Sequence, residues 1–221
     1  MVNLRDLGGY EAKNGAVTAW GRLYRSDLPA GLGEQEIGTI RELGITTVID
    51  LRSEQERIRK PNSLQEAEGI VYCPIPAFGN GRLPSEQERV EDTYLEIAMG
   101  KEAMFRVFQT ILQAQGAVLF HCTAGKDRTG VTAALLLSLA GVCKQDIVAD
   151  YILTGAYLKE KVSEFCREYP EIPIHWLMPQ AEYIETFLEK MAERFSTPEE
   201  YFYELGFTEQ ETKKLKEKIL E

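Results

Sequence analysis

The sequence lacks the features of membrane proteins and of nucleic-acid binders. None of its apolar runs approaches the roughly 20 residues that a membrane-spanning helix needs, and no charged-then-apolar signal segment opens the chain. Positive charge is scarce, since 25 lysines and arginines stand against 35 acidic residues and the net charge is −10. DNA, RNA and anionic lipid surfaces repel such a protein over long range. We therefore expect a protein that has no integral membrane segment, binds no nucleic acid and is cytoplasmic; a chain from which an export signal had been removed would show the same sequence features.

The sequence also lacks metal-type cysteine spacing and internal linkers. Its four cysteines form no CxxC pair and no zinc-type group with His121 or His175. We interpret them as reduced thiols and predict no metal and no cofactor. No repeat, low-complexity tract or Pro/Gly/Ser-rich linker divides the 221 residues, of which 44% are hydrophobic. We therefore expect a single domain over residues 1–221 with a substantial core.

Strand and helix patterns alternate along the chain. The β-prone pieces over 3–26 are separated by glycine turns, which predicts a hairpin within an N-terminal region 1–30. Buried-strand patterns cover 46–51, 70–75 and 117–120. Helical spacing covers 33–43, 90–112 with a break at Gly100, 128–139, 146–162 and 181–195, and two short helices follow within 197–221. This order predicts an α/β fold with a mostly parallel central sheet flanked by helices, and C-terminal helices 181–221 that pack on the same domain.

The most informative segment is His-Cys-Thr-Ala-Gly-Lys-Asp-Arg-Thr-Gly at residues 121–130. It places Cys122 at the end of a strand, Arg128 six positions later and a helix directly afterwards. Ligands of open α/β sheets bind beyond the carboxyl ends of the strands. Loop amides, a helix N-terminus and a forked guanidinium all bind a phosphate dianion. The segment therefore predicts a phosphate or oxyanion site built from the loop residues Thr123, Ala124, Gly125, Lys126, Asp127 and Arg128.

The same groups predict a covalent reaction at Cys122. Positive dipoles and an arginine favour the thiolate form of a cysteine, which is the nucleophilic form. We expect Cys122 to attack phosphorus and expel an alcohol or phenol, after which water hydrolyses the phosphocysteine. Arg128 and the amides stabilise the equatorial oxygens, and the Thr129 hydroxyl is placed to bond the departing sulfur. His121 is expected to orient the loop and support the thiolate rather than to titrate.

The extended motif His-Cys-x-x-Gly-x-x-Arg-Thr-Gly resembles the active-site loop of protein-tyrosine phosphatases, and its form here is similar to that of the bacterial atypical dual-specificity group. The similarity extends to residues 3–9, 23–26, 48–52 and 201–220. The resemblance implies the phosphatase fold, a metal-independent mechanism and hydrolysis of phosphotyrosine. Phosphoserine, phosphothreonine and phosphoinositides are further candidate substrates in that group. A phosphorylated protein or a phosphoinositide is thus the expected partner.

The proton donor for the leaving group remains open between several carboxyl groups. Many cysteine phosphatases carry an aspartate on the loop after the preceding strand, but residues 74–81 contain no acid here. Asp127 is the preferred candidate, although a loop aspartate can also serve only to hold the loop. The fallback candidates are Asp92, Glu86, Glu88 and Glu91.

Two alternatives to a protein phosphatase stay open at this point. One is a phosphoinositide phosphatase, in which Lys126 contacts a second phosphate on the inositol ring; a solvent-exposed loop lysine is the competing interpretation. The other is a phosphate-binding module without catalysis, against which the intact Cys122, Arg128 and Thr129 argue.

Other residues allow a functional and a structural interpretation. Arg5, Asp6, Arg25, Asp50 and Arg52 either ring the pocket or form structural ion pairs, and we favour the ion pairs. Cys73 either forms a disulfide with Cys122 that protects the nucleophile or is a plain core thiol. We favour the core thiol.

Overall fold

The computed structural model describes residues 1–77 and 89–221. In this part of the chain, one five-stranded sheet has the strand order β1-β2-β5-β3-β4. Strands β2, β5, β3 and β4 run parallel, and only β1 is antiparallel to its neighbour. The strands are β1 (Arg5–Asp6), β2 (Leu23–Ser26), β3 (Ile45–Asp50), β4 (Val71–Pro74) and β5 (Ala117–His121). The mostly parallel α/β architecture is as predicted.

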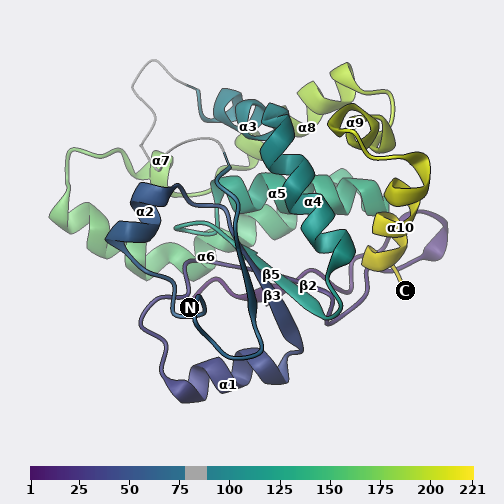
Figure 1. Ribbon diagram of the computed structural model, residues 1–221. Coiled ribbons are helices and arrows are strands. Elements are labelled where there is room, and N and C mark those ends of the chain that lie inside the picture. Colours follow the sequence, from purple (N-terminus) through teal and green to yellow (C-terminus); the bar gives the residue numbers. More distant parts are fainter. Residues whose placement is uncertain (78–88) are drawn as a thin grey trace.

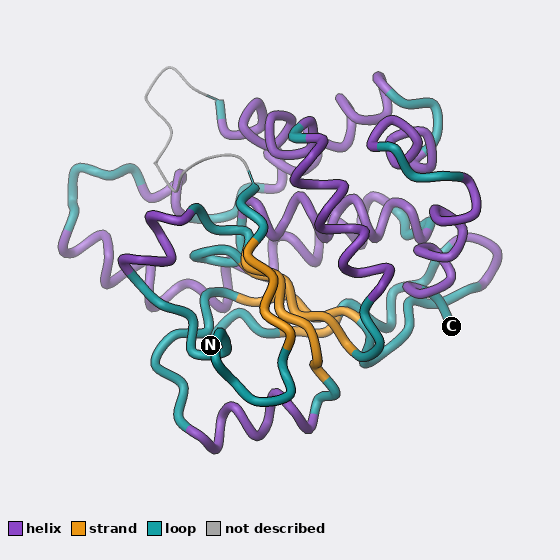
Figure 2. The backbone as a smooth tube through the Cα atoms, viewed as in Figure 1, coloured by secondary structure: helices purple, strands orange, loops and turns teal. Residues whose placement is uncertain are grey.

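Helices account for most of the remaining residues, as the tube in Figure 2 shows. They are α1 (Glu34–Glu42), α2 (Glu54–Arg59), α3 (Val90–Met99), α4 (Lys101–Gln113), α5 (Asp127–Ala140), α6 (Lys144–Glu168), α7 (Ile174–Leu177), α8 (Ala181–Arg194), α9 (Pro198–Leu205) and α10 (Glu209–Ile219). Gly100 separates α3 from α4, as expected. Among the helices described, none is both long enough and apolar enough to cross a membrane.

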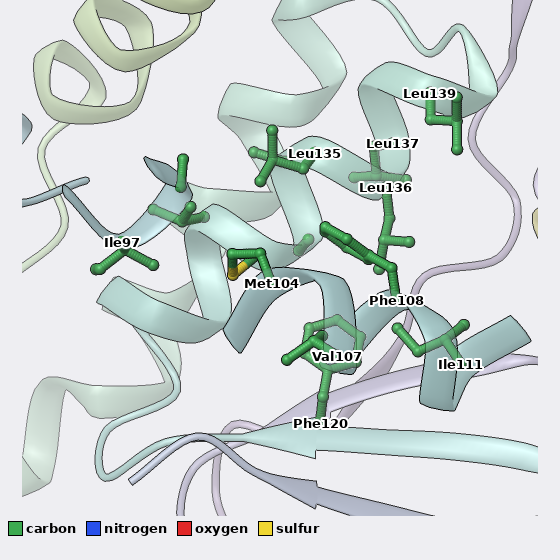
Figure 3. Packing of buried hydrophobic residues seen from close by; sticks show 14 of the residues in the cluster. Ile97, Met104, Val107, Phe108, Ile111, Phe120, Leu135, Leu136, Leu137 and Leu139 are labelled. Atoms are coloured by element: carbon green, nitrogen blue, oxygen red, sulfur yellow. The ribbon is translucent and has the colours of Figure 1, made fainter. Parts of the chain in front are cut away.

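The two faces of the sheet are covered unequally. Alternation along β5 sends Val118 and Phe120 into a large cluster with helix residues, whereas Leu119 joins a smaller cluster with Ile37 and Ile40 of α1. Figure 1 shows α1 on one side of the sheet and α3, α4, α5 and α8 to α10 on the other. In Figure 3, Phe120 of the strand lies directly below Val107 of α4. The larger cluster encloses α5, whose residues are nearly all buried because its sequence is apolar on every face.

Three elements differ from the sequence-based expectation. β1 and β2 do pair antiparallel, but a long connection joins them instead of a tight hairpin turn. Helix α6 extends beyond the predicted 146–162 at both ends, and the single-turn helix α7 was not predicted. α7 follows Pro173, which presets the backbone for a helix start, and ends at Leu177; the next residue, Met178, is extended and directly precedes Pro179.

Candidate active site

Cys122 directly follows β5, at the carboxyl end of the central strand, and α5 begins five residues later. We call residues 122–128 the phosphate loop. Gly125 has a φ of +70°, and a Cβ at this position would lie 2.3 Å from the carbonyl oxygen of Ser26. Only glycine meets both constraints, because other residues avoid positive φ and carry a Cβ. The tight curve of the loop against β2 therefore depends on Gly125.

The backbone N–H groups of the phosphate loop are not used by the part of the fold that the structure describes. Those of residues 123–128 donate no hydrogen bond to any described residue. The first helical bond of α5 runs from Gly130 N to the Lys126 carbonyl at 2.8 Å. A turn of free amides at a helix N-terminus is a favourable place for an anion. All six residues predicted to bind phosphate thus lie in one such turn.

Arg128 lies beside Cys122 and is held by Glu56 of α2. Its Nη1 and Nη2 atoms each donate to one carboxylate oxygen of Glu56 at 2.7 Å. Burial lowers the pKa of Arg128, but the hydrogen bonds and the negative charge of Glu56 raise it more, so that the pKa lies above its ordinary value. Cys122 itself is only 2% exposed. The guanidinium is therefore permanently charged, and Glu56 fixes its orientation.

Glu56 is a site residue that the sequence analysis missed. Its carboxylate also accepts a hydrogen bond from the Thr123 hydroxyl at 2.6 Å and one from the Ser53 amide at 2.9 Å. Burial raises the pKa of Glu56, but the bonds and charge of Arg128 lower it more, to about 2. A signal was available, because Ser53 and Glu56 form a capping box directly after the similar segment 48–52.

His121 and Thr129 flank the phosphate loop, at the end of β5 and in the first turn of α5. The Asn62 side-chain amide lies 2.8 Å from His121 Nε2, and its oxygen accepts from the Leu64 amide, so its nitrogen faces the ring. His121 Nδ1 then carries the proton and donates to the Cys122 carbonyl at 2.9 Å. Burial lowers the pKa of His121, which keeps the ring neutral. The Thr129 hydroxyl is buried and has no hydrogen-bond partner among the described residues.

Asp127 and Lys126 contact each other and two other elements. Asp127 Oδ1 accepts from the Tyr94 hydroxyl at 2.6 Å and lies 3.3 Å from Lys126 Nζ. The Asp127 side chain is 38% exposed, so a leaving group can approach it. Lys126 is 3% exposed and donates to the Trp176 carbonyl of α7 at 2.6 Å. The interpretation of Lys126 as a solvent-exposed loop lysine is therefore wrong.

Two of the fallback proton donors, Asp92 and Glu91, are held in ion pairs. Asp92 pairs with Lys190 at 2.6 Å on the surface, and Glu91 is paired with Arg89. Glu86 and Glu88 lie outside the described residues. Among the described carboxyl groups, Asp127 is the candidate that belongs to the phosphate loop itself.

The ion pairs near the N-terminus are structural. Asp150 of α6 binds both Arg5, at 2.8 Å, and Arg25 in the protein interior. Arg25 also donates to the Gly125 carbonyl at 2.8 Å, and Asn3 donates to the same oxygen at 3.2 Å. These residues hold the phosphate loop from behind rather than ring a pocket.

Asp50, Arg52 and Asp6 form separate structural contacts. Asp50 binds Arg52 at 2.7 Å, while Asp6 accepts from the Gly8 and Gly21 amides. Burial raises the pKa of Asp50, but the hydrogen bonds from Arg52 and from the Tyr72 hydroxyl lower it more, to about 2.

The structure contradicts a disulfide between Cys73 and Cys122. In the sheet, Cys73 of β4 is in register with Ile49 of β3, and β3 lies between β4 and β5. Two strand spacings place the two chains about 10 Å apart. A disulfide joins Cα atoms that lie no more than about 7 Å apart. Burial raises the pKa of the Cys73 thiol, as expected of a plain core cysteine.

Comparisons with known proteins agree with the motif. The sequence model described as "Tyrosine phosphatase family" matches residues 1–221. A tyrosine-protein phosphatase of Nostoc commune is 36% identical over 136 residues, 58% of this chain and 46% of that protein. The triple specificity protein phosphatase PtpB of Mycobacterium tuberculosis is 30% identical over 204 residues, 75% of this chain and 72% of that protein.

The relatives differ in how much of their length this chain covers. The chain spans 60% of a relative from Cupriavidus necator and less than half of the Nostoc protein. Among solved structures, TpbA of P. aeruginosa in complex with pTyr has a TM-score of 0.41 and 21% identity, covering 62% of this chain and 70% of that chain. Because the family model spans the whole length of the sequence, this chain belongs to the tyrosine phosphatase family.

Proposed function

We propose that the protein is a cysteine-dependent phosphomonoester hydrolase that acts on phosphotyrosine through a phosphocysteine intermediate. The observation that carries the proposal is the arrangement of the phosphate loop: Cys122 lies in a turn whose amides donate to no described residue, and the charged Arg128, held by Glu56, belongs to the same turn. Family membership supports the same reaction class.

In the first step, the Cys122 sulfur forms a bond to phosphorus while the bond from phosphorus to the phenol oxygen breaks. The loop amides and Arg128 stabilise the charge on the three equatorial oxygens. Asp127 supplies the proton that the departing phenol takes up, because it is the partly exposed carboxyl group of the loop. His121 contributes by fixing the Cys122 carbonyl and not by proton transfer.

In the second step, water attacks phosphorus and the sulfur leaves as a thiolate. The Asp127 carboxylate takes a proton from that water, which restores the starting state. The Thr129 hydroxyl donates a hydrogen bond to the sulfur as it leaves. Its buried oxygen has no other partner among the described residues, which supports this role.

The contacts of the Lys126 ammonium group favour a protein substrate over an inositol lipid. A second phosphate on an inositol ring needs a free cation beside the loop, whereas the Lys126 ammonium already binds the Trp176 carbonyl and lies near Asp127. Side-by-side turnover of phosphotyrosine peptides and phosphoinositide micelles tests the choice. A higher kcat/KM for the lipids would replace phosphotyrosine by phosphoinositides as the preferred substrate.

The decisive experiment replaces Cys122 with Ser. We expect Cys122→Ser to hydrolyse p-nitrophenyl phosphate at least about 10⁴-fold more slowly, because the nucleophile is lost, and to keep binding of vanadate or phosphate within a fewfold. Cys143→Ser is the matched control at an exposed thiol and should keep full activity. An inactive wild-type protein that still binds vanadate would identify a phosphate-binding module instead.

We also propose that residues 1–221 act as one domain. The C-terminal helices contribute Phe187, Phe202 and Ile219 to the same buried cluster as Phe120 of the central strand. Cytoplasmic location and independence from metals and cofactors stay predictions from the sequence.

A further inference from the structure

Two buried tyrosines lie behind Asp127. The Tyr94 hydroxyl, from α3, donates to Asp127 Oδ1 at 2.6 Å and lies 2.5 Å from the hydroxyl of Tyr151, from α6. Both tyrosines are fully buried, whereas the Asp127 side chain is partly exposed. Their rings pack edge to face with centroids 6.1 Å apart, and the Tyr151 ring lies against Gly130 of α5. The two tyrosine hydroxyls thus link the protein core to Asp127 of the phosphate loop through consecutive hydrogen bonds.

The hydrogen bonds that join Tyr151, Tyr94 and Asp127 have one favourable donor-to-acceptor direction. Burial and the charge of Asp127 raise the pKa of both tyrosines well above the ordinary value, so each hydroxyl keeps its single proton. Tyr151 has no hydroxyl partner other than Tyr94 among the described residues. If Asp127 donated to Tyr94, the Tyr151 proton would be buried without an acceptor, which is unfavourable. Tyr151 therefore donates to Tyr94, and Tyr94 donates to Asp127.

The two oxygens of Asp127 consequently differ. Oδ1 accepts from the Tyr94 hydroxyl and also lies 3.3 Å from the Lys126 ammonium, so the hydrogen bond and the ion pair involve the same atom. Oδ2 accepts no hydrogen bond from any described residue. A proton on Asp127 is therefore most stable on Oδ2.

We propose that Tyr94 and Tyr151 are positioning residues that occupy Oδ1 of Asp127 and leave Oδ2 to exchange the catalytic proton. This inference rests on the proposed function. As sulfur bonds to phosphorus and the phenol oxygen leaves, the proton moves from Oδ2 to that oxygen. The carboxylate that remains is stabilised by the Tyr94 hydrogen bond. In the second step, Oδ2 takes the proton back from the attacking water.

The test compares two substrates that differ in their need for an acid. Phenyl phosphate has a poor leaving group and depends on proton donation, whereas p-nitrophenyl phosphate has an activated one. We expect Tyr94→Phe to lower kcat on phenyl phosphate about tenfold, and kcat on p-nitrophenyl phosphate less than about twofold. KM and vanadate inhibition should change less than about twofold, because the anion contacts are intact.

Tyr201→Phe is the matched control. It removes a buried hydroxyl that donates to the Ala98 carbonyl at 2.8 Å and makes no hydrogen bond with a described residue of the phosphate loop. It should leave the ratio of the two kcat values unchanged. Tyr151→Phe provides a second test that does not depend on the folding of Tyr94→Phe, with an expected loss of about threefold on phenyl phosphate alone.

Asp127→Asn separates the inference from the proposed function. In this background, Tyr94→Phe should cause no further loss on phenyl phosphate, because the group it positions is gone. Equal losses on both substrates in Tyr94→Phe, or a further loss in the double variant, would overturn the positioning role while Cys122-dependent hydrolysis stands. Retained turnover in Cys122→Ser would instead overturn the proposed function itself.

Discussion

The outer and inner sides of the phosphate loop differ in how their polar groups are bonded. On the outer side, backbone carbonyls accept hydrogen bonds from residues distant in sequence: Asn3 and Arg25 bind Gly125, and the Leu28 amide binds Thr123. On the inner side, the amides of residues 123–128 donate to no described residue. Carbonyls held from outside keep the amides turned inward. The loop is therefore ordered before any anion binds, which lowers the entropic cost of binding.

Arg25, which binds the outer side of the loop, belongs to a group of buried ion pairs. Asp150 joins Arg5 and Arg25 into one buried ionic group. Burial raises the pKa of Asp150, but the charges of the two arginines lower it below its ordinary value. Breaking one member leaves a buried charge unpaired, which is strongly destabilising. We therefore expect outer-side variants to lose stability as well as activity, and inner-side variants to lose mainly activity.

Among the variants that compare the two sides of the loop, the largest effect is expected on the inner side, at Arg128. Arg128→Lys keeps one positive charge but loses the two-pronged contact that fits a phosphate. We expect kcat/KM on p-nitrophenyl phosphate to fall about 10³-fold while thermal unfolding shifts by only a few degrees. Arg57→Lys, a matched change on α2 that retains a donor near the Arg52 carbonyl, should stay within about twofold. A loss below tenfold in Arg128→Lys would contradict the role of the inner side.

An intermediate effect on both activity and stability is expected on the outer side, at Gly125. Gly125→Ala forces a side chain into a φ of +70° and places its Cβ 2.3 Å from the Ser26 carbonyl. We expect a loss of about 1–3 kcal/mol from the backbone alone, together with a fall in kcat/KM of about 10²-fold as the loop shifts.

Gly69→Ala controls for backbone strain without a collision. Its φ is +77°, and nothing lies within 4 Å of the added Cβ. Chemical denaturation and kinetics of both variants separate the two causes. If Gly69→Ala lowered activity as much as Gly125→Ala, contact with β2 would not be what shapes the loop.

The sequence predicts the inner side of the loop far better than the outer side. Cys122, Arg128 and Thr129 lie within eight residues of one another, so the spacing of one segment already defines their arrangement. The parallel sheet and the break at Gly100 also follow from local patterns. Such features depend on interactions between near neighbours, which periodicity and turn chemistry report directly.

The partners of the loop residues depend on packing between distant elements. Glu56 meets Arg128 across 72 residues of sequence, and Tyr94 meets Asp127 across 33. Lys126 is buried because α7, a helix of four residues, lies against it. The pattern of a single sequence does not show which charged residue of a helix will contact a loop that follows a distant strand. The capping box at Glu56 predicts a helix start but not its contact with the active site.

The smallest effect is expected at Glu56, which bridges α2 and the inner side. Glu56→Gln keeps the shape of the side chain but places an amide N–H where Arg128 needs an acceptor. We expect kcat/KM to fall about tenfold, because Arg128 loses orientation but remains charged. Glu54→Gln, an exposed position in the first turn of the same helix, should leave kcat/KM within about twofold.

The stability of Glu56→Gln should depend on pH in a defined direction. The pKa of Glu56 is about 2 in the folded protein against an ordinary 4.5, so its contribution to stability is complete above 4.5 and disappears as the pH falls towards 2. The variant should therefore unfold at a lower temperature than the wild type near pH 7, and the difference should shrink from pH 4.5 downwards. A difference that stayed constant between pH 7 and pH 3 would show that Glu56 does not pair with Arg128 as an anion. The contact between α2 and the phosphate loop would then not be an ion pair. In that case an anionic Glu56 would not be what holds Arg128 on the inner side of the loop.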